Sequence, residues 1–399
     1  MPPKKPREIL FDLFRRHYGY TPPLEAVAPV PLELMGSFAE VGGGLTLGLA
    51  LDRAVHLAFA PRTDGKVELV STAHVEKQIF TLHQGGSAIA SNWIQPIQAV
   101  IQQLQKRSAV VRGFSMACHT TIPEELNTQH AAALRVAAAL ALRRMFPYTL
   151  TATGISAPPK ADRKGELSPL SASEMIHLAQ LCQKAEGNVP GIHGGVSAHL
   201  FCLCARPFQA VEFDCQNITI EQAPLIGEIS IVLCPMSSQP VSKDEPDKWK
   251  QLSLSAARKL GLKSLRSADV PYLKANRARL SEPEFTFARH MAAENQRIIF
   301  AMRALNGGDL LQVGELLNQS YNSLRELFDA SETDGWIKLA REQPGCIAAS
   351  IGGVQSPSAF ALVMHNQAEK FIAQMASAFA ATSGRTLQPI ICRTAGGGK

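Results

Sequence analysis

Residues 45–60 have the sequence Leu-Thr-Leu-Gly-Leu-Ala-Leu-Asp-Arg-Ala-Val-His-Leu-Ala-Phe-Ala. Its first seven residues alternate with a period of two, which predicts a strand. Thr63-Asp64-Gly65-Lys66 predicts a hairpin turn, because Asp-Gly allows the positive φ angles of a type I′ turn. Val67-Glu-Leu-Val-Ser71 would close that hairpin. This β-rich opening argues against a Rossmann-type start.

The rest of the chain mixes helical and strand patterns. Ser171-Ala-Ser-Glu174 is a capping box that opens a helix ending near Gly187. Other helices are expected at 6–17, 94–106, 131–145, 252–260, 284–305, 310–327, 334–342 and 368–382. Strands are expected at 109–118, 201–205, 210–214, 228–233, 359–364 and 387–392. The glycine-rich tail 395–399 is expected to be disordered.

Composition excludes several classes of protein. The 399 residues are 46% hydrophobic and 19% charged, which is typical of a folded protein. A net charge of +6 without a basic stripe argues against nucleic-acid binding. The apolar runs are too short to span a membrane, and no export signal is recognisable, so we expect a cytoplasmic protein.

The eight cysteines are expected to be reduced core residues. Cys202-Leu-Cys204 is predicted to lie on a strand, where packing explains both thiols better than zinc does. His193 and His199 have no carboxylate or cysteine at ligand spacing. We therefore predict no metal site.

Several segments together resemble the galactokinase family of the GHMP small-molecule kinase superfamily. The sequence Ala288-Arg-His-Met-Ala-Ala-Glu-Asn-Gln-Arg297 is similar to the family's "ARHVVTENERV", and Leu317-Asn-Gln-Ser-Tyr-Asn-Ser-Leu-Arg325 to its "MNESHASLRDDY". Residues 28–53 match its opening "APGRVNLIGEHTDYNGG" and the strand ending "ALDR". The likeness runs in the same order along nearly the whole chain.

This resemblance implies a fold of two domains with a central cleft. Residues 1–205 would form an N-terminal α/β domain, and residues 206–399 a C-terminal α+β domain of ferredoxin-like character. A kinase of this type holds a sugar hydroxyl, binds ATP with Mg²⁺, and stabilises charge on the phosphoryl group that moves. Each task has a sequence signature in the family, and each signature is altered here.

The opening motif has lost most of its polar side chains. The family's arginine falls on Pro31, which supplies neither a cation nor a backbone donor. The family's Glu-His-Thr-Asp falls on Ser37-Phe38-Ala39-Glu40, so only Glu40 keeps a carboxylate. The sugar-binding positions implied by the resemblance are Ser37, Glu40 and Gly43. A solvent-facing loop residue is the other interpretation of Glu40.

The phosphate motif departs furthest from the family. Its "PxGAGLSSSAA" corresponds to Pro123-Glu-Glu-Leu-Asn-Thr-Gln-His-Ala-Ala-Ala133, which contains no glycine. Glu124 and Glu125 bring carboxylates to a place meant for polyphosphate, at a cost on the order of 1–3 kcal/mol for each repulsive pair. The implied nucleotide-binding positions are Asn127, Thr128, Gln129 and His130. Asn127 or Thr128 is otherwise expected to be an ordinary helix N-cap.

The signature of the catalytic aspartate is also changed. The family's "GIMDQ" becomes Gly191-Ile-His-Gly-Gly195, so Gly194 falls on the aspartate. His193 is the nearby side chain that could substitute as a base, although a loop histidine is the simpler interpretation. The family's "GAGFGGC" keeps two glycines, Gly352 and Gly353, with Pro357 interrupting it.

Three hypotheses follow from these changes. The first is a galactokinase-like protein without catalysis, which binds a small sugar, another metabolite or a protein partner. The second is an active, divergent sugar 1-phosphotransferase, the one case that requires ATP and Mg²⁺ as cofactors. The third is a scaffold or regulatory subunit without a small ligand. The number of altered signatures favours the first, since each lost acid/base group costs roughly 10²–10⁴ in rate.

Overall fold

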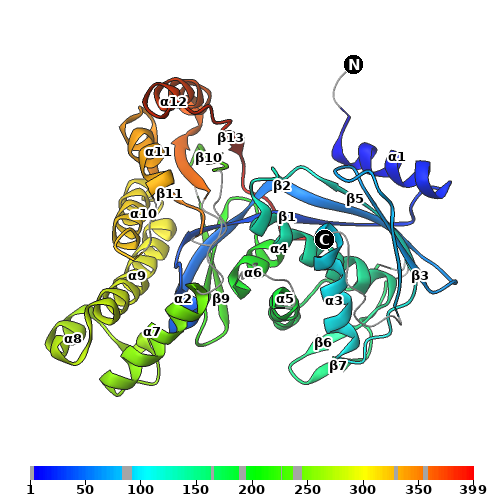
Figure 1. The fold of residues 1–399 in the computed structure, drawn as a ribbon, viewed down its shortest axis with the longest axis horizontal. Coiled ribbons are helices and arrows are strands. Elements are labelled where there is room, and N and C mark those ends of the chain that lie inside the picture. The colour runs from blue at the N-terminus through cyan, green and yellow to red at the C-terminus, as the bar shows by residue number, and fades with distance from the viewer. Residues whose placement is uncertain are drawn as a thin grey trace. The chain divides into compact units, whose positions relative to one another are not determined.

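The computed structural model describes residues 4–82, 92–162, 166–187, 195–225, 227–236, 245–327, 331–353 and 358–399. Contacts group the chain into two units (Figure 1). Unit 1 holds residues 1–31, 52–204 and 396–399, and unit 2 holds 32–51 and 205–395. Two strands, β1 (Leu24–Met35) and β2 (Leu45–Pro61), pair with each other and continue from one unit into the other. The domain boundary at residue 205 stays a prediction, because contact grouping does not test independent folding.

In unit 1 the strands follow the order β4 (Gln78–Thr81), β3 (Lys66–Ser71), β5 (Phe114–Thr120) and the C-terminal half of β2. The β5 strand is antiparallel to β2 and parallel to β3, so it lies between them. The predicted hairpin of β2 and β3 is therefore wrong. The Asp-Gly turn fixes only the local backbone and does not decide which strands pair. Gly113, just before β5, allows the chain to pass close to β3, because a Cβ on Gly113 would lie 2.6 Å from Lys66 O.

The helices of unit 1 include one that was predicted as a strand. They are α1 (Pro6–Tyr18), η1 (Asn92–Ile94), α3 (Gln95–Gln105), α4 (Asn127–Met145), α5 (Ala172–Glu186) and α6 (Val196–Cys204), with a small hairpin of β6 (Thr149–Thr151) and β7 (Gly154–Ser156). The strand expected at 201–205 is wrong, because a short all-apolar run has no period that separates a buried helix from a buried strand. The Ser171 capping box is confirmed: Ser171 Oγ accepts from the Glu174 amide at 3.2 Å.

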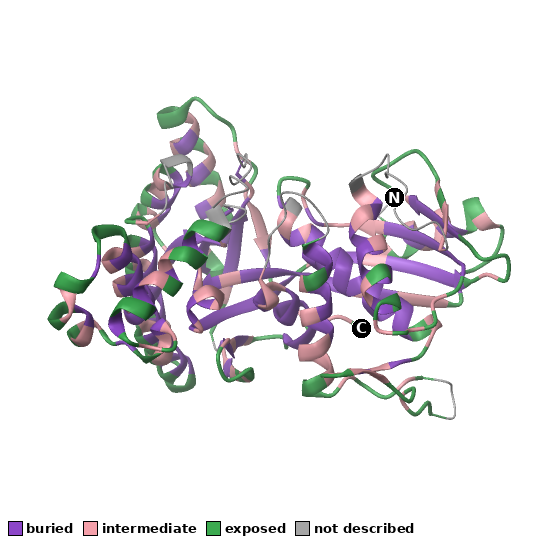
Figure 2. Cartoon of the chain, turned by 60° about the horizontal axis from the view of Figure 1, so that its bottom comes forward, coloured by how far each residue is buried: buried purple, intermediate pink, exposed green. Residues whose placement is uncertain are grey.

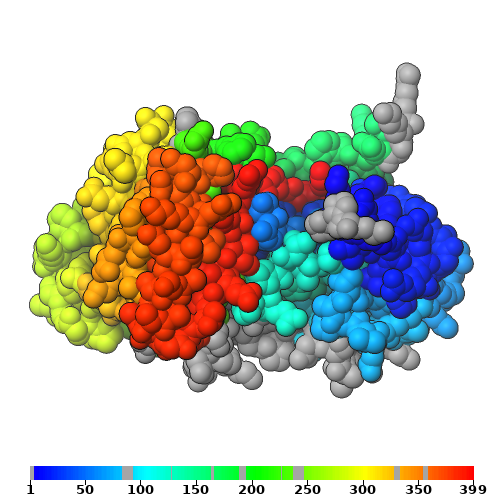
Figure 3. Space-filling view, turned by 90° about the horizontal axis from the view of Figure 1, so that it is seen from above, coloured from blue at the N-terminus to red at the C-terminus, as the bar shows by residue number. Residues whose placement is uncertain are grey.

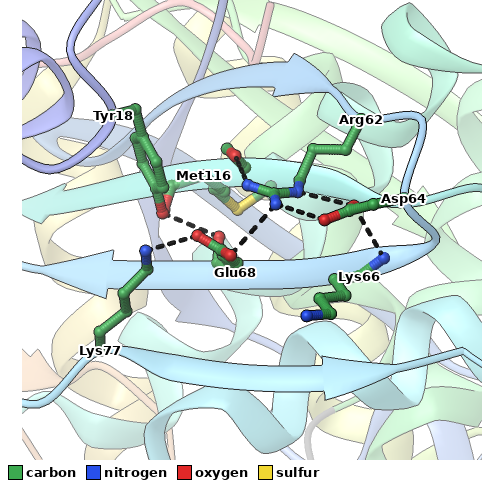
Figure 4. Close-up of polar contacts among 8 residues, drawn as sticks. Tyr18, Arg62, Asp64, Lys66, Glu68, Lys77 and Met116 are labelled. Atoms are coloured by element: carbon green, nitrogen blue, oxygen red, sulfur yellow. Dashed lines mark hydrogen bonds and ion pairs between the residues drawn. The ribbon is translucent and has the colours of Figure 1, made fainter.

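A polar network fastens α1 to the sheet of unit 1 (Figure 4). The Tyr18 hydroxyl lies 2.9 Å from Glu68 O and 3.2 Å from Met116 O. The carboxylate of Glu68 pairs with Arg62 at 3.2 Å and Lys77 at 2.5 Å. Figure 3 shows α1, in dark blue, on the surface of this unit. These groups satisfy one another, so we assign the network a structural role.

Unit 2 contains an antiparallel sheet in the order β11 (Cys346–Ile351), β12 (Ala359–Met364), β10 (Ile229–Cys234) and β13 (Ile390–Cys392). Trp336 and Phe371 are fully buried in its core, together with strand residues. The helices that cover it are α10 (Leu310–Leu324), α11 (Ser331–Glu342) and α12 (Ala368–Ser383). Most residues of β10, β11 and β12 are buried, and Figure 2 colours buried residues purple.

A second part of unit 2 surrounds the N-terminal half of β2. Its strands are β8 (Gln209–Asp214), which pairs with β2, and β9 (Thr219–Pro224), which the sequence analysis missed. Its helices are α2 (Ala39–Gly42), α7 (Glu245–Leu260), α8 (Val270–Ala275) and α9 (Glu282–Gly307), with short η2 (Leu265–Ser267) and η3 (Arg277–Arg279); η4 (His365–Gln367) precedes α12. The α9 helix is central, because it contacts α7, α8, α10 and β9.

The C-terminal tail is ordered, so the prediction of disorder is wrong. Val27 and Lys399 exchange two backbone hydrogen bonds of 2.8 and 2.9 Å, and the Gly398 amide donates to Cys202 O at 2.7 Å. A Cβ on Gly398 would lie 2.9 Å from Leu140 Cδ1. The missing side chains let the tail approach closely enough for these bonds. Among the described helices, none has the length and apolar character needed to cross a membrane.

Candidate functional site

The loop that should bind a sugar joins β1 to β2 in unit 2. It starts at Gly36, whose φ is 100° and where a Cβ would lie 2.5 Å from Leu45 O. The single turn of α2 follows, and Gly43 closes it with a φ of 68°. Both glycines have backbone conformations that other residues rarely adopt. The loop is thus a tight, folded turn.

The predicted sugar-binding residues of this loop have other contacts. Ser37 is buried, and its hydroxyl donates to Glu33 Oε1 at 2.5 Å. Glu40 is half-buried in the first turn of α2. A Cβ on Gly43 would meet Gln216 at 3.5 Å and Ser264 Oγ at 3.6 Å. A sugar-binding role for these three residues stays a prediction.

Glu33 is a site candidate that the sequence analysis missed. Burial, aided by the nearby carboxylates of Glu40 and Glu294, raises the pKa of Glu33 to about 7, although the Ser37 hydrogen bond opposes this. The side chain can therefore hold or release a proton near neutral pH. One glutamate within an apolar strand segment gives no sequence signal, because its burial depends on the fold.

Phe38, which the resemblance aligns with the family's histidine, packs as a core residue. Its φ is 68°, which is unusual for a residue with a side chain. The ring lies 4.6 Å from Trp249 and 6.1 Å from Phe287, centroid to centroid. Aromatic packing of this kind stabilises the strained backbone and leaves no polar group for a ligand.

Two residues of α9 bond to both ends of the same loop. The Gly36 amide donates to Glu294 Oε1 at 2.9 Å, and the Leu45 amide donates to Asn295 Oδ1 at 2.9 Å. Glu294 is buried, accepts from Ser320 Oγ at 2.6 Å and pairs with Arg297 at 2.7 Å. The motif residues quoted from α9 and α10 thus contact each other and the loop.

The position that the family resemblance implies for phosphate binding is the start of α4 in unit 1. Leu126 is the N-cap residue of α4, and its side chain makes no capping hydrogen bond, so the prediction of Asn127 or Thr128 as N-cap is wrong. A polar residue is usually preferred at this position, but here burial of Leu126 in the core decides which residue caps the helix. Glu124 and Glu125, just before the helix, are exposed.

The first turn of α4 carries no cation. Gln129 is buried and His130 is half-buried. Burial, with a smaller effect from neighbouring His74, lowers the pKa of His130 to about 4. A neutral imidazole and an amide are weak substitutes for the hydroxyls that would accompany Mg²⁺. Roles of Thr128, Gln129 and His130 in nucleotide binding stay predictions, as does that of Asn127.

An aromatic pair near His130 was also missed. The rings of His74 and Trp93 are stacked, with centroids 5.4 Å apart and an interplanar angle of 8°. Trp93 is half-buried, and its Nε1 has no hydrogen-bond partner among the described residues. Such a pair can stack against a planar heteroaromatic ring. The two residues are 19 positions apart, His74 in a loop and Trp93 in the short η1, and no periodic pattern marks them.

The residues proposed at the catalytic position, His193 and Gly194, lie outside the described residues. Just beyond them, His199 on α6 is fully buried, with Nδ1 3.1 Å from Gly195 O. Its Nε2 lies 3.4 Å from Glu186 Oε1, which also pairs with Arg135 at 3.0 Å. Burial and then Arg135 lower the pKa of His199 to about 3, so the ring is neutral.

A metal centre and disulfides are not observed in the described part of the chain. No group of three His, Cys, Asp or Glu side chains there could hold a metal ion. All eight cysteines are free, and burial raises the pKa of six of the thiols: Cys118, Cys182, Cys202, Cys204, Cys234 and Cys346.

The chain is similar to galactokinases along its length. It is 28% identical over 402 residues to the galactokinase of Chloroflexus aurantiacus, covering 98% of this chain and 96% of that protein. Human galactokinase is 27% identical over 352 residues, covering 85% and 83%. No family model matches the chain.

Solved structures show the fold. Lactococcus lactis galactokinase, solved with galactose, superposes with a TM-score of 0.85 at 20% identity, covering 98% of this chain and 99% of that one. A mevalonate kinase structure gives a TM-score of 0.58 at 11% identity, covering 93% and 99%. The mixed α/β architecture is therefore that of the GHMP kinases.

Proposed function

This chain belongs to the galactokinase family of the GHMP small-molecule kinase superfamily, and we propose that it is a member with impaired phosphotransfer that acts by binding a small metabolite or a protein partner. The observation that carries the proposal is the start of α4. No glycine is present there, Glu124 and Glu125 are exposed, and burial holds His130 neutral. A polyphosphate would meet negative charge with no cation in the first turn to offset it.

The opening loop supports the same proposal. Pro31 stands at the family's arginine, and Phe38, at the family's histidine, is packed against Trp249. The sequence also places Gly194 at the family's aspartate. Three separate tasks of the kinase thus lose their side chains. Among small ligands, a sugar is the first candidate, because Ser37 and Glu40 keep polar groups on the loop.

The alternative is an active, divergent sugar kinase that uses ATP and Mg²⁺. One observation favours it: the stacked His74 and Trp93 would suit an adenine ring, near a helix N-terminus whose dipole attracts anions. Retained nucleotide binding and lost catalysis are compatible, so this observation does not require phosphotransfer.

A thermal-shift series with galactose, other hexoses, ATP and ADP, combined with an ADP-release assay, tests the proposal. A ligand at about 100 times its Kd stabilises the fold by about 2.7 kcal/mol, so even modest binders are detected. A shift with a sugar or nucleotide, without turnover, supports the proposal. Rapid turnover contradicts the proposal of impaired phosphotransfer. If none of these sugars and nucleotides shifts the melting temperature, the proposal that the protein binds one of them is wrong.

We also propose that the protein works in a reducing compartment such as the cytoplasm. All eight cysteines are free thiols, and six of them are buried. Exported proteins usually pair their cysteines instead. Labelling of free thiols in protein taken directly from cells would check this, and a disulfide-linked fraction would contradict it.

A further inference from the structure

The loop at residues 36–44 rests on one face of α9. Met291, Glu294 and Asn295 have the i, i+3, i+4 spacing that places side chains together on a helix. A Cβ on Gly42 would lie 3.0 Å from Met291 Cε, and one on Gly44 would lie 2.9 Å from Asn295 Oδ1. The glycines therefore let the loop backbone lie directly against this face of the helix.

Two side chains of that face accept hydrogen bonds from the backbone at the two ends of the loop, one from its first amide and one from the amide just after its last residue. Glu294 Oε1 accepts from the Gly36 amide, and Asn295 Oδ1 accepts from the Leu45 amide, both at 2.9 Å. Between these points the loop closes on itself, because Gly44 donates to Ala39 O at 2.7 Å. The folded loop thus has its two external anchors on adjacent residues of a single helix.

The anchors are themselves fixed before any ligand arrives. Arg297 Nε donates to Glu294 Oε2 at 2.8 Å, and Ser320 Oγ donates to Glu294 Oε1 at 2.6 Å. Both acceptor residues are buried, with 2% of Glu294 and 5% of Asn295 exposed. A buried carboxylate with these partners keeps one rotamer, which is what precise positioning of a binding loop needs.

We propose that Glu294 and Asn295 are positioning residues that hold the loop at residues 36–44 in its ligand-binding conformation without contacting the ligand. The effect on ligand binding rests on the proposed function, since it assumes that Ser37 and Glu40 of this loop contact a ligand. The claim that α9 holds the loop in place does not need that assumption and is measured separately.

Hydrogen–deuterium exchange of peptides covering residues 36–45 tests the structural part. Asn295→Leu removes the acceptor, and Gly44→Ala pushes the loop away from α9 while leaving the helix unchanged. Both are expected to speed exchange of these peptides at least about tenfold, because the Leu45 amide loses its bond. Asn318→Leu is the matched control: it removes an asparagine acceptor from another backbone amide of unit 2, that of Ala349 at 3.3 Å, and leaves both loop amides bonded.

Peptides of β10 and β12 report whether unit 2 stays folded. Faster exchange in 36–45 alone, in both variants and not in Asn318→Leu, supports the proposal. Unchanged exchange in Gly44→Ala and Asn295→Leu overturns it, and so does an equal increase in the Asn318→Leu control. If Asn295→Leu unfolds the unit, Gly44→Ala decides the outcome.

Calorimetry with D-galactose as the probe tests the consequence. We expect Asn295→Leu to raise the Kd at least about fivefold and Asn318→Leu to leave it unchanged, since one lost loop anchor is a loss of preorganisation. Equal Kd values in wild type and Asn295→Leu overturn the consequence. If wild type binds no galactose, the sugar proposal fails, and the exchange experiment still decides the positioning claim.

Discussion

The Ser37 hydroxyl donates to Glu33 Oε1 at 2.5 Å, so a residue expected to bind sugar is already bonded to β1, the strand that precedes its loop. Burial is the largest cause of the raised pKa of Glu33, which is about 7. Since Ser37 of the loop is hydrogen-bonded to this carboxyl, a change of pH near 7 alters the contact between the loop and Glu33. At physiological pH the Glu33 side chain is partly protonated. A ligand that competes for Ser37 would therefore change the protonation of Glu33.

Glu33 should make the folded state less stable as pH rises. Its folded pKa of about 7 exceeds the ordinary value of 4.5, so its contribution is complete below pH 4.5 and is lost by about pH 7. Glu33→Gln should remove on the order of 1–3 kcal/mol of pH dependence across this window. Urea unfolding at several pH values measures the difference from wild type. Exposed Glu315→Gln is the control, and equal slopes for wild type and Glu33→Gln would refute the assignment.

Removing the carboxylates before α4 should strengthen nucleotide binding. Glu124→Gln with Glu125→Gln deletes two exposed negative charges, and we expect the Kd for ADP to fall about three- to thirtyfold at low salt. Calorimetry with ADP measures this, with Glu315→Gln plus Glu369→Gln, two exposed glutamates of unit 2, as the charge-matched control. The gain should shrink at high salt. An unchanged Kd at low salt would show that phosphates bind elsewhere.

Trp93 should carry the base of any bound nucleotide. Trp93→Ala removes the stacking surface and should raise the Kd for ADP about 5- to 100-fold, while Trp93→Phe keeps most of the affinity. Trp249→Phe, in unit 2, is the control for a general effect of tryptophan loss. Equal ADP affinity in Trp93→Ala and wild type would rule out stacking on this residue.

The buried Arg135, Glu186 and His199 group should matter for stability. Arg135→Met leaves the Glu186 carboxylate without its cation and should cost about 3–5 kcal/mol. Arg135→Met with Glu186→Leu removes both charges and should cost less. Urea unfolding tests this order, with exposed Arg303→Met as the control. A double variant less stable than the single one would contradict a buried ion pair of this kind.

The sequence was sufficient where the signal was local. The period of two in residues 45–51 predicted β2, and Ser171 with Glu174 predicted the start of α5. The apolar run 201–205 has no such period, and the helix α6 was missed there. Local turn chemistry at Asp64-Gly65 also could not reveal that β5 lies between β2 and β3.

The family resemblance named the loop at residues 36–44 as a candidate site, and its binding role stays a prediction. The contacts of this loop could not be predicted, because the bond from Gly36 to Glu294 joins residues 258 positions apart. No single-sequence pattern reports such a contact, because it depends on packing of α9 against the loop. The same holds for Glu33, whose raised pKa follows from burial and from charges far along the chain.

The most direct test is ADP release by the purified protein with Mg-ATP and D-galactose, corrected for ATP hydrolysis without sugar. The account predicts turnover below about 10⁻² s⁻¹, because the acid/base and charge-stabilising groups are missing. Galactose-dependent turnover of about 1–10² s⁻¹, as in ordinary kinases, would contradict it.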